Sequence, residues 1–469
     1  MLNKSDQKSV MQLARSYAND GINLLDLRLH PRDQISWHET GLAAADIMKD
    51  QWAKRTNLGN LGNSYLYLGE PWKAIEFYEQ ALNISVEIGN QQGEGVCLGN
   101  LGNRYADLGK PWKAIEFYDQ ALKISREIGD HKNEGVWLGN LGLAYSHLGE
   151  PWKAIEFYEQ ALKISRDIGD KRNEGAWLVS LGGAYSHLGE PRKVIEFYEQ
   201  ALKISRETGD RRGEGAGLGN LGNRYADLGK PCKAIEFYDQ ALKISREIGD
   251  KRNEGVWMGN LGLAYSHLGE PRKAIEYLEQ ALKISREIGD RRVEGADLGN
   301  LGLAYSDLGD PRKAIEFYEQ ALKIAREIAD KPNESEFLCN LGKAYLDLKE
   351  VDKTINNCTE SLDLASSMEY RKFEGEALCT LGRAFIAEGE MQKALEHCDQ
   401  ALQIFKDIEY PKGEAEALFA KSQALHQLGQ PEKAIFCAQQ ALAIFQRIES
   451  PLAEKVRQQL AEWGGPRES

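Results

Sequence analysis

The sequence lacks long apolar runs and has few cysteines. No uninterrupted apolar stretch in its 469 residues approaches the roughly 20 needed to cross a bilayer, so we expect no transmembrane helix and no membrane partner. The seven cysteines are an odd number without a C-x-x-C pair, and the N-terminal MLNKSDQKSV has no apolar core of a secretion signal. These features predict a reduced, cytoplasmic protein.

Basic residues are outnumbered as well. Lys and Arg total 59 against 72 Asp and Glu, and the formal net charge is −13. Binding to nucleic acid requires clustered cations that displace counterions from phosphates, so we expect no nucleic-acid partner. The chain also has no G-x-S-x-G, no H-E-x-x-H and no phosphate-binding loop. We therefore predict that it is not an enzyme and needs no cofactor.

What the sequence does contain is a repeat of 40 residues without insertion or deletion. Its leucine recurs at Leu61, Leu101, Leu141, Leu181, Leu221, Leu261, Leu301, Leu341 and Leu381, and a tenth copy follows around Lys421. Each copy predicts two helices. In residues 94–133, Leu98, Leu101 and Tyr105 form the apolar stripe of the first helix, and Pro111 opens a second helix that Gly129 ends.

Charged residues on the second helix predict local support. An acid precedes a base by four residues, the spacing that favours ion pairs on one helix face. These pairs are Asp119 and Lys123, Glu159 and Lys163, Glu199 and Lys203, and Glu319 and Lys323.

The repeated motif L-G-N-x-x-Y-x-x-L-G-x-P-x-K-A-I-E-x-Y-x-Q-A-L resembles the tetratricopeptide repeat in its long variety. That variety is similar to the arrays of LGN-type adaptors, kinesin light chains and bacterial STAND signalling ATPases. The resemblance implies an all-α, right-handed α-solenoid, or superhelix, of about ten helix-turn-helix units. One departure is that Arg126, Arg166 and their equivalents replace the family's usual proline near the end of the second helix.

The domain division follows from the repeat. We expect residues 54–449 to form ten repeats, residues 1–53 a degenerate N-terminal capping repeat, and residues 450–469 a C-terminal capping helix with a short tail. Terminal repeats of a solenoid diverge because one face meets water.

A row of asparagines is the clearest polar signal. The resemblance implies that first helices line a concave groove and that this row contacts peptide ligands. Primary amides both donate and accept hydrogen bonds, so such a row can hold the backbone of an extended peptide. Alternatively, the row bonds to itself or to neighbouring helices. Its members are Asn60, Asn100, Asn140, Asn220, Asn260, Asn300 and Asn340.

Two further columns vary along the expected groove. One holds Asn63, Asn103 and Asn223 and changes to Lys343 and Arg383, which suits a ligand with distinct segments, although drift explains the change almost as well. The other holds Asp107, His147, His187, Asp227 and His267. Because equivalent positions in successive repeats lie roughly 10 Å apart, we expect a polar groove wall there and no metal site.

Tryptophans fall into two groups. Trp72, Trp112 and Trp152 follow the proline that opens the second helix, and two interpretations remain: packing over the adjacent loop, or an exposed aromatic strip for a partner or for self-association. Trp137, Trp177 and Trp257 lie near the start of first helices, where we expect them in the core between repeats.

These observations predict a non-enzymatic scaffold that binds a peptide segment or a partner domain in its concave groove. The alternative is a regulatory or sensor array that controls a separate signalling ATPase or protease.

Overall fold

The computed structural model describes residues 30–448, 450 and 452–464, and every regular element in these ranges is an α-helix. The all-α prediction is therefore confirmed. Residues 1–29, which include much of the predicted N-terminal capping repeat, lie outside the described residues, as does most of the predicted C-terminal tail. Within the described ranges, no helix combines the length and apolar character needed to cross a bilayer.

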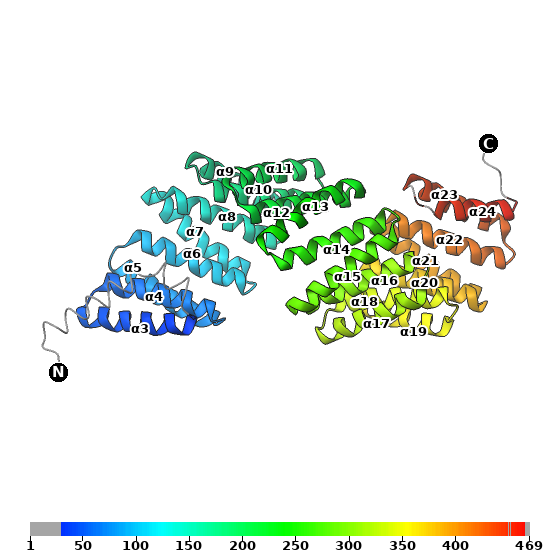
Figure 1. Ribbon diagram of the computed structural model, residues 1–469, viewed down its shortest axis with the longest axis horizontal. Coiled ribbons are helices and arrows are strands. Elements are labelled where there is room, and N and C mark those ends of the chain that lie inside the picture. The colour runs from blue at the N-terminus through cyan, green and yellow to red at the C-terminus, as the bar shows by residue number, and fades with distance from the viewer. Residues whose placement is uncertain (1–29, 449, 451, 465–469) are drawn as a thin grey trace. The chain divides into compact units, whose positions relative to one another are not determined.

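The helices alternate as first and second members of successive repeats (Figure 1). In chain order they are α3 (Pro31–Met48), α4 (Gln51–Tyr67), α5 (Pro71–Glu87), α6 (Gln91–Asp107), α7 (Pro111–Ile128), α8 (His131–His147), α9 (Pro151–Asp167), α10 (Lys171–His187), α11 (Pro191–Thr208), α12 (Arg211–Asp227), α13 (Pro231–Ile248), α14 (Lys251–His267), α15 (Pro271–Ile288), α16 (Arg291–Asp307), α17 (Pro311–Glu327), α18 (Lys331–Asp347), α19 (Val351–Ser367), α20 (Arg371–Glu388), α21 (Met391–Asp407), α22 (Pro411–Gln427), α23 (Pro431–Arg447) and α24 (Leu452–Glu462).

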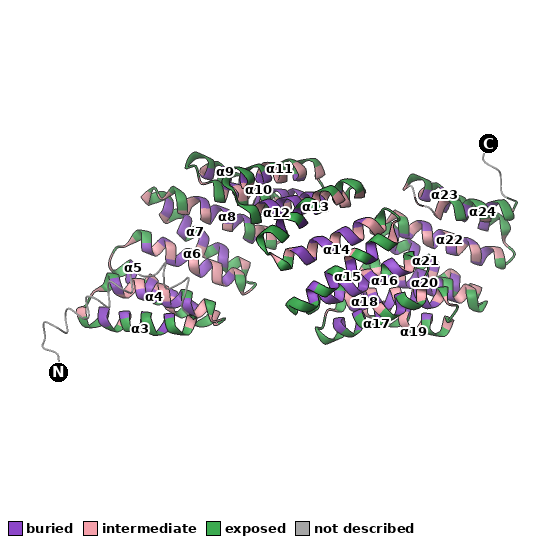
Figure 2. Ribbon diagram, viewed as in Figure 1, coloured by how far each residue is buried: buried purple, intermediate pink, exposed green. Residues whose placement is uncertain are grey.

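The chain divides into two compact units, here called unit 1 (residues 1–224) and unit 2 (residues 225–469). Within each unit, a first helix packs against the second helix of its own repeat, and that second helix packs against the next first helix. Figure 2 shows the result: most helices are buried along one side and exposed along the other. Stacking lets each repeat bury surface that one helix pair would leave in water.

Helix ends follow the local sequence. Pro111 is the first residue of α7, where a missing amide hydrogen costs nothing. Gly129 then adopts φ 69°, and the amide of Asp130 donates to the carbonyl of Ser125 at 2.8 Å. The Asp130 carboxylate accepts from the amide of Asn133 at 3.1 Å and caps α8. The predicted boundaries in this repeat are confirmed.

The arginine that replaces the usual proline has a structural role. Arg166 Nε lies 3.0 Å from Glu174 Oε1, and Lys171 Nζ lies 2.8 Å from Glu174 Oε2, so the carboxylate joins a second helix to the next first helix. Burial raises the pKa of Glu174, but the hydrogen bonds from Lys171 and Arg166 outweigh it and lower the pKa overall. The same arginine pairs occur at Arg126 and Glu134, Arg206 and Glu214, Arg246 and Glu254, Arg286 and Glu294, and Arg326 and Glu334.

The predicted pairs within the second helix are wrong. Over the described residues, none of the four acid-before-base pairs at spacing four comes within ion-pair distance. The charged side chains that do pair mostly join turns and successive helices.

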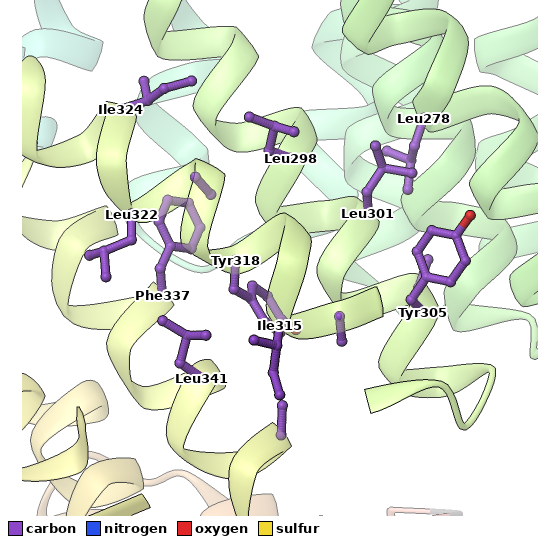
Figure 3. Packing of buried hydrophobic residues seen from close by; sticks show 14 of the residues in the cluster. Leu278, Leu298, Leu301, Tyr305, Ile315, Tyr318, Leu322, Ile324, Phe337 and Leu341 are labelled. Carbon is purple, nitrogen blue, oxygen red and sulfur yellow. The ribbon is translucent and has the colours of Figure 1, made fainter. Parts of the chain in front are cut away.

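Inside each repeat, aromatic rings and glycines set the packing. Tyr105 stacks on Phe117 with ring centroids 5.4 Å apart, and a Cβ on Gly102 would lie 2.6 Å from Tyr118 Cε1. The first helix can therefore approach the second only because Gly102 has no side chain. Figure 3 shows the corresponding core of unit 2, where Leu301, Tyr318 and Phe337 come from the three successive helices α16, α17 and α18.

Between repeats, a tryptophan lies directly over a glycine. Trp137 is 4% exposed, and a Cβ on Gly99 would lie 2.1 Å from its Cη2 atom. Trp177 covers Gly139 in the same way, also at 2.1 Å. Trp137 and Trp257 are buried and Trp177 is partly buried, so the predicted core position of these three residues is confirmed.

Candidate functional site

The asparagine row lies on the first helices, and all seven side chains are partly buried. One member of the row, Asn140, bonds to the neighbouring column, which holds Asn63 and Asn103. Asn103 Oδ1 accepts from Asn140 Nδ2 at 3.0 Å and from the Tyr118 hydroxyl at 2.7 Å. The Tyr78 hydroxyl donates to Asn63 Oδ1 at 2.5 Å. Asn140 is therefore held by a neighbouring helix, as the second of the two interpretations expects, and Asn63 and Asn103 are held in the same way by tyrosines of their own repeats.

The histidine and aspartate column lies in the last turn of first helices. His147, His187, His267, Asp107 and Asp227 are all exposed, and Asp107 Oδ2 lies 3.0 Å from Arg104 Nη1. Within the described part of the chain, His, Cys, Asp and Glu nowhere form a group of three or more that could hold a metal ion.

Three predicted residues come together in unit 2. Asn340 and Lys343 of α18 and Arg383 of α20 line one cavity of about 450 Å³, here called the C-terminal pocket. The first helices α16, α18, α20 and α22 supply most of its wall, and α24 supplies Leu452 and Lys455. Its other charged and polar lining residues include Asp307, Asp347, Glu376, Thr380, Lys412, Glu416 and Gln423, beside Tyr318, Cys379 and Phe419.

A partly buried ion pair crosses this pocket. Lys343 Nζ lies 2.6 Å from Glu376 Oε2. Burial disfavours the Lys343 ammonium, but the negative charge of a Cys339 thiolate and of Glu376 outweighs it, so the pKa of Lys343 is raised well above its usual value. Because burial raises the pKa of Cys339 to about 11, Glu376 is the partner that is charged at neutral pH. Lys343 therefore remains a cation in the pocket.

The remaining cations of the pocket are unpaired. Among the described residues, Arg383, Lys412 and Lys455 have no carboxylate within ion-pair distance, although they share the pocket with Asp347 and Glu416. Unpaired charges at a concave surface can bind charged groups of a ligand, and Asn340 and Gln423 beside them can bond to a peptide backbone. The pocket thus suits a polypeptide that carries charged side chains.

The tryptophans after the proline are exposed. Trp72 is 54% exposed, Trp112 61% and Trp152 62%, each at the second residue of its helix. Lys110 Nζ lies 4.9 Å from the centroid of the Trp72 ring. Contact of these three tryptophans with a partner or with a second copy of the chain stays a prediction.

The family model of the tetratricopeptide repeat matches residues 54–127, 98–167, 213–287, 255–327, 292–367 and 373–447, and a second model of that repeat matches residues 177–212. The chain belongs to the tetratricopeptide repeat family. No curated protein matches it.

Solved structures share the tetratricopeptide fold. A STAND protein with a tetratricopeptide repeat sensor from Pyrococcus horikoshii has a TM-score of 0.56 at 17% identity, covering 79% of this chain and 54% of that one. The apo quorum sensor NprR from B. thuringiensis has a TM-score of 0.54 at 17% identity, covering 76% of this chain and 99% of that one. Apo RapI has a TM-score of 0.51 at 18% identity, with coverages of 59% and 99%.

Several residues of the C-terminal pocket were missed from the sequence of this tetratricopeptide array. Glu376 and Glu416 belong to a column that holds Val or Ala in repeats such as those of Val136 and Ala176, and this column turns acidic from Glu336 onward. That change was a readable signal. Lys455 could not be found in this way, because α24 lies outside the repeat.

Proposed function

We propose that this chain is a non-enzymatic scaffold that binds a peptide segment or a partner domain, and that the C-terminal pocket is a main contact. One observation carries the proposal: Asn340, Lys343 and Arg383 line a single pocket together with unpaired Lys412 and Lys455. Tetratricopeptide repeats generally present such surfaces to proteins, and this supports the assignment. The proposal includes a cytoplasmic location, which the seven free thiols support because reducing compartments keep thiols in that form.

The test is a selection of peptides from a random display library on the immobilised full chain, followed by affinity measurement for the best binders. Arg383→Glu should weaken binding about tenfold or more, because a charge reversal in a concave site replaces attraction by repulsion. Arg312→Glu is the matched control, since Arg312 is exposed on the second helix α17 outside the pocket. Equal effects of the two variants would contradict the proposal.

A second candidate is a sensor array that regulates a separate signalling ATPase or protease. The fold shared with the Pyrococcus horikoshii STAND protein, whose repeats are described as a sensor, favours it. Purification of the full chain with an ATPase or protease whose rate changes on addition of the array would support this role. A partner without such activity would support the plain scaffold.

A further inference from the structure

One interface between repeats reverses the tryptophan-over-glycine arrangement. Gly99 and Gly139 lie under Trp137 and Trp177, and in unit 2 a Cβ on Gly299 would lie 2.3 Å from Phe337 Cε1. At the junction of α10 with α12, the glycine position holds Val179 and the aromatic position holds Gly217. The residue at the glycine position has become larger, and the residue at the aromatic position has become smaller.

The missing indole leaves an open space. Val179 is 38% exposed, and Tyr198 is only partly buried, whereas the equivalent Tyr118 and Tyr158 are 3% and 2% exposed. A cavity of about 760 Å³ opens here, called the unit 1 pocket, with Val179, Ala201, Ile204 and Gly217 among its wall residues. A Cβ built on Gly217 would meet Leu202 at 3.6 Å, an ordinary contact, so the site has room for a side chain.

The rim of the unit 1 pocket is mainly basic. Lys171, Arg172 and Arg212 line it with one acid, Asp210. In two later repeats the arginine equivalent to Arg172 is paired. Arg252 Nη2 lies 3.7 Å from Asp290 Oδ2, and Arg292 Nε lies 3.4 Å from Asp330 Oδ2. Arg172, by contrast, has no ion-pair partner among the described residues, and Asp210 caps its helix by accepting from the amide of Gly213 at 2.9 Å. An exposed, unpaired guanidinium beside an apolar cavity favours an acidic group on whatever enters.

We propose that the unit 1 pocket binds an aromatic side chain of a partner polypeptide, tryptophan by preference, with a neighbouring carboxylate of that partner paired to Arg172. The partner's ring takes the place that Trp137 and Trp177 take within the chain. Buried aromatic anchors of this kind dominate the binding energy of many interfaces. This inference rests on the proposed role in binding polypeptides but uses a site separate from the C-terminal pocket.

Three blocked peptides test the pocket on the full chain: N-acetyl-Glu-Trp-Glu-amide, N-acetyl-Glu-Ala-Glu-amide and N-acetyl-Lys-Trp-Lys-amide, each titrated with detection of the peptide by NMR. We expect the Glu-Trp-Glu peptide to bind about tenfold or more tightly than either of the others, because only it offers both the ring and the carboxylates. The double variant Val179→Gly/Gly217→Trp rebuilds the arrangement of Gly99 with Trp137 and fills the pocket. It should lose that binding and retain or raise the melting temperature.

Val179→Gly alone is the matched control, since it leaves the pocket open and should keep binding. Arg172→Glu, an exposed change that does not disturb the fold, should reverse the preference toward the Lys-Trp-Lys peptide. Unchanged binding by Val179→Gly/Gly217→Trp, or equal binding of the Trp and Ala peptides, would overturn the inference. Arg383→Glu separates the two proposals: it should weaken peptides selected on the C-terminal pocket and leave the Glu-Trp-Glu peptide unaffected.

Discussion

Units 1 and 2 fill the same position between repeats with different chemistry. In unit 1, Trp137 lies over Gly99, whereas in unit 2 the equivalent residue is Asp297, which is 4% exposed and lies over Gly259. A Cβ on Gly259 would lie 3.4 Å from Asp297 Oδ1, so this glycine is under much less steric demand than Gly99. The contact is tight and apolar at Trp137, as it is where Phe337 lies over Gly299 in unit 2, and it is looser and polar at Asp297.

Later repeats of unit 2 show what is kept constant. There the position equivalent to Gly99 holds Cys339 or Cys379, and the position equivalent to Trp137 holds Ala377 or Ala417. All four residues are buried. As the first residue grows from glycine to cysteine, the second shrinks from an aromatic ring to a methyl group. These two interfaces of unit 2 thus preserve the filling of the contact, as close packing of protein interiors requires, and not the identity of either residue.

The largest expected effect comes from breaking the tight contact of unit 1. Trp137→Gly should lower the local stability of α6 to α8 by on the order of 5 kcal/mol, because it removes a buried ring and adds a glycine to a helix. Gly99→Val should cost about 3 kcal/mol, since its side chain would overlap the indole. Native-state hydrogen exchange of these helices measures both changes.

The double variant Gly99→Val/Trp137→Gly copies the natural pair of Val179 and Gly217 and should recover part of the loss. Gly183→Val is the control, because a Cβ there meets nothing within 4 Å. If the stability lost by the double variant equalled the sum of the losses of the two single variants, the two residues would not compensate each other. The interpretation that they form one paired contact would then be wrong.

The fold was predictable because the repeat presents the same evidence many times. Pro111, Gly129 and Asp130 define helix ends by their own backbone chemistry, which needs no knowledge of the neighbours. Contacts between repeats were not predictable in this way. In the sequence, Arg166 is notable only because it replaces the family's usual proline. Its pairing with Glu174 depends on how α9 and α10 meet across a turn.

A smaller effect tests the polar contact of unit 2. Burial raises the pKa of the Asp297 carboxyl from 3.8 to about 7, the nearby charges of Asp290 and Glu294 add to this, and a hydrogen bond from Ser285 at 2.9 Å opposes it. A carboxyl whose pKa is raised by folding binds its proton more tightly in the folded state. The stability that the folded protein gains from this tighter proton binding is therefore complete below pH 3.8 and is lost as the pH rises through about 7.

Asp297→Asn should remove this loss, because the amide is neutral at every pH. Each pH unit of pKa displacement corresponds to about 1.4 kcal/mol, so the variant should exceed the wild type in stability at pH 8 by on the order of 4 kcal/mol. Urea unfolding at pH 5 and pH 8 measures the difference, which should narrow at the lower pH. If the unfolding free energies of the two proteins changed with pH in parallel, ionisation of Asp297 would not destabilise the folded protein, and the prediction would be wrong.

The candidate site was predictable only in part. Lys343 and Arg383 were found because they interrupt a column that otherwise repeats, and Asn340 because it continues the asparagine row. The C-terminal pocket brings the three residues together. The unit 1 pocket required two residues 38 positions apart, Val179 and Gly217, to be considered as one contact. A single sequence shows each as an isolated exception, and only the packing relates them.

The smallest expected effect concerns the turns. Repeats of unit 1 end first helices with glycine in the left-handed region, such as Gly109 at φ 68° and Gly149 at φ 72°, whereas Lys349 of unit 2 adopts φ 61° with a full side chain. A Cβ in this region is strained, so Lys349→Gly should stabilise unit 2 by about 0.5 to 1 kcal/mol after the added freedom of glycine in the unfolded chain is counted. The reverse change, Gly109→Lys, should destabilise unit 1 by a similar amount. Urea unfolding midpoints of both variants measure the two effects, and a lower midpoint for Lys349→Gly would mean that the lysine side chain makes contacts worth more than the strain of its backbone.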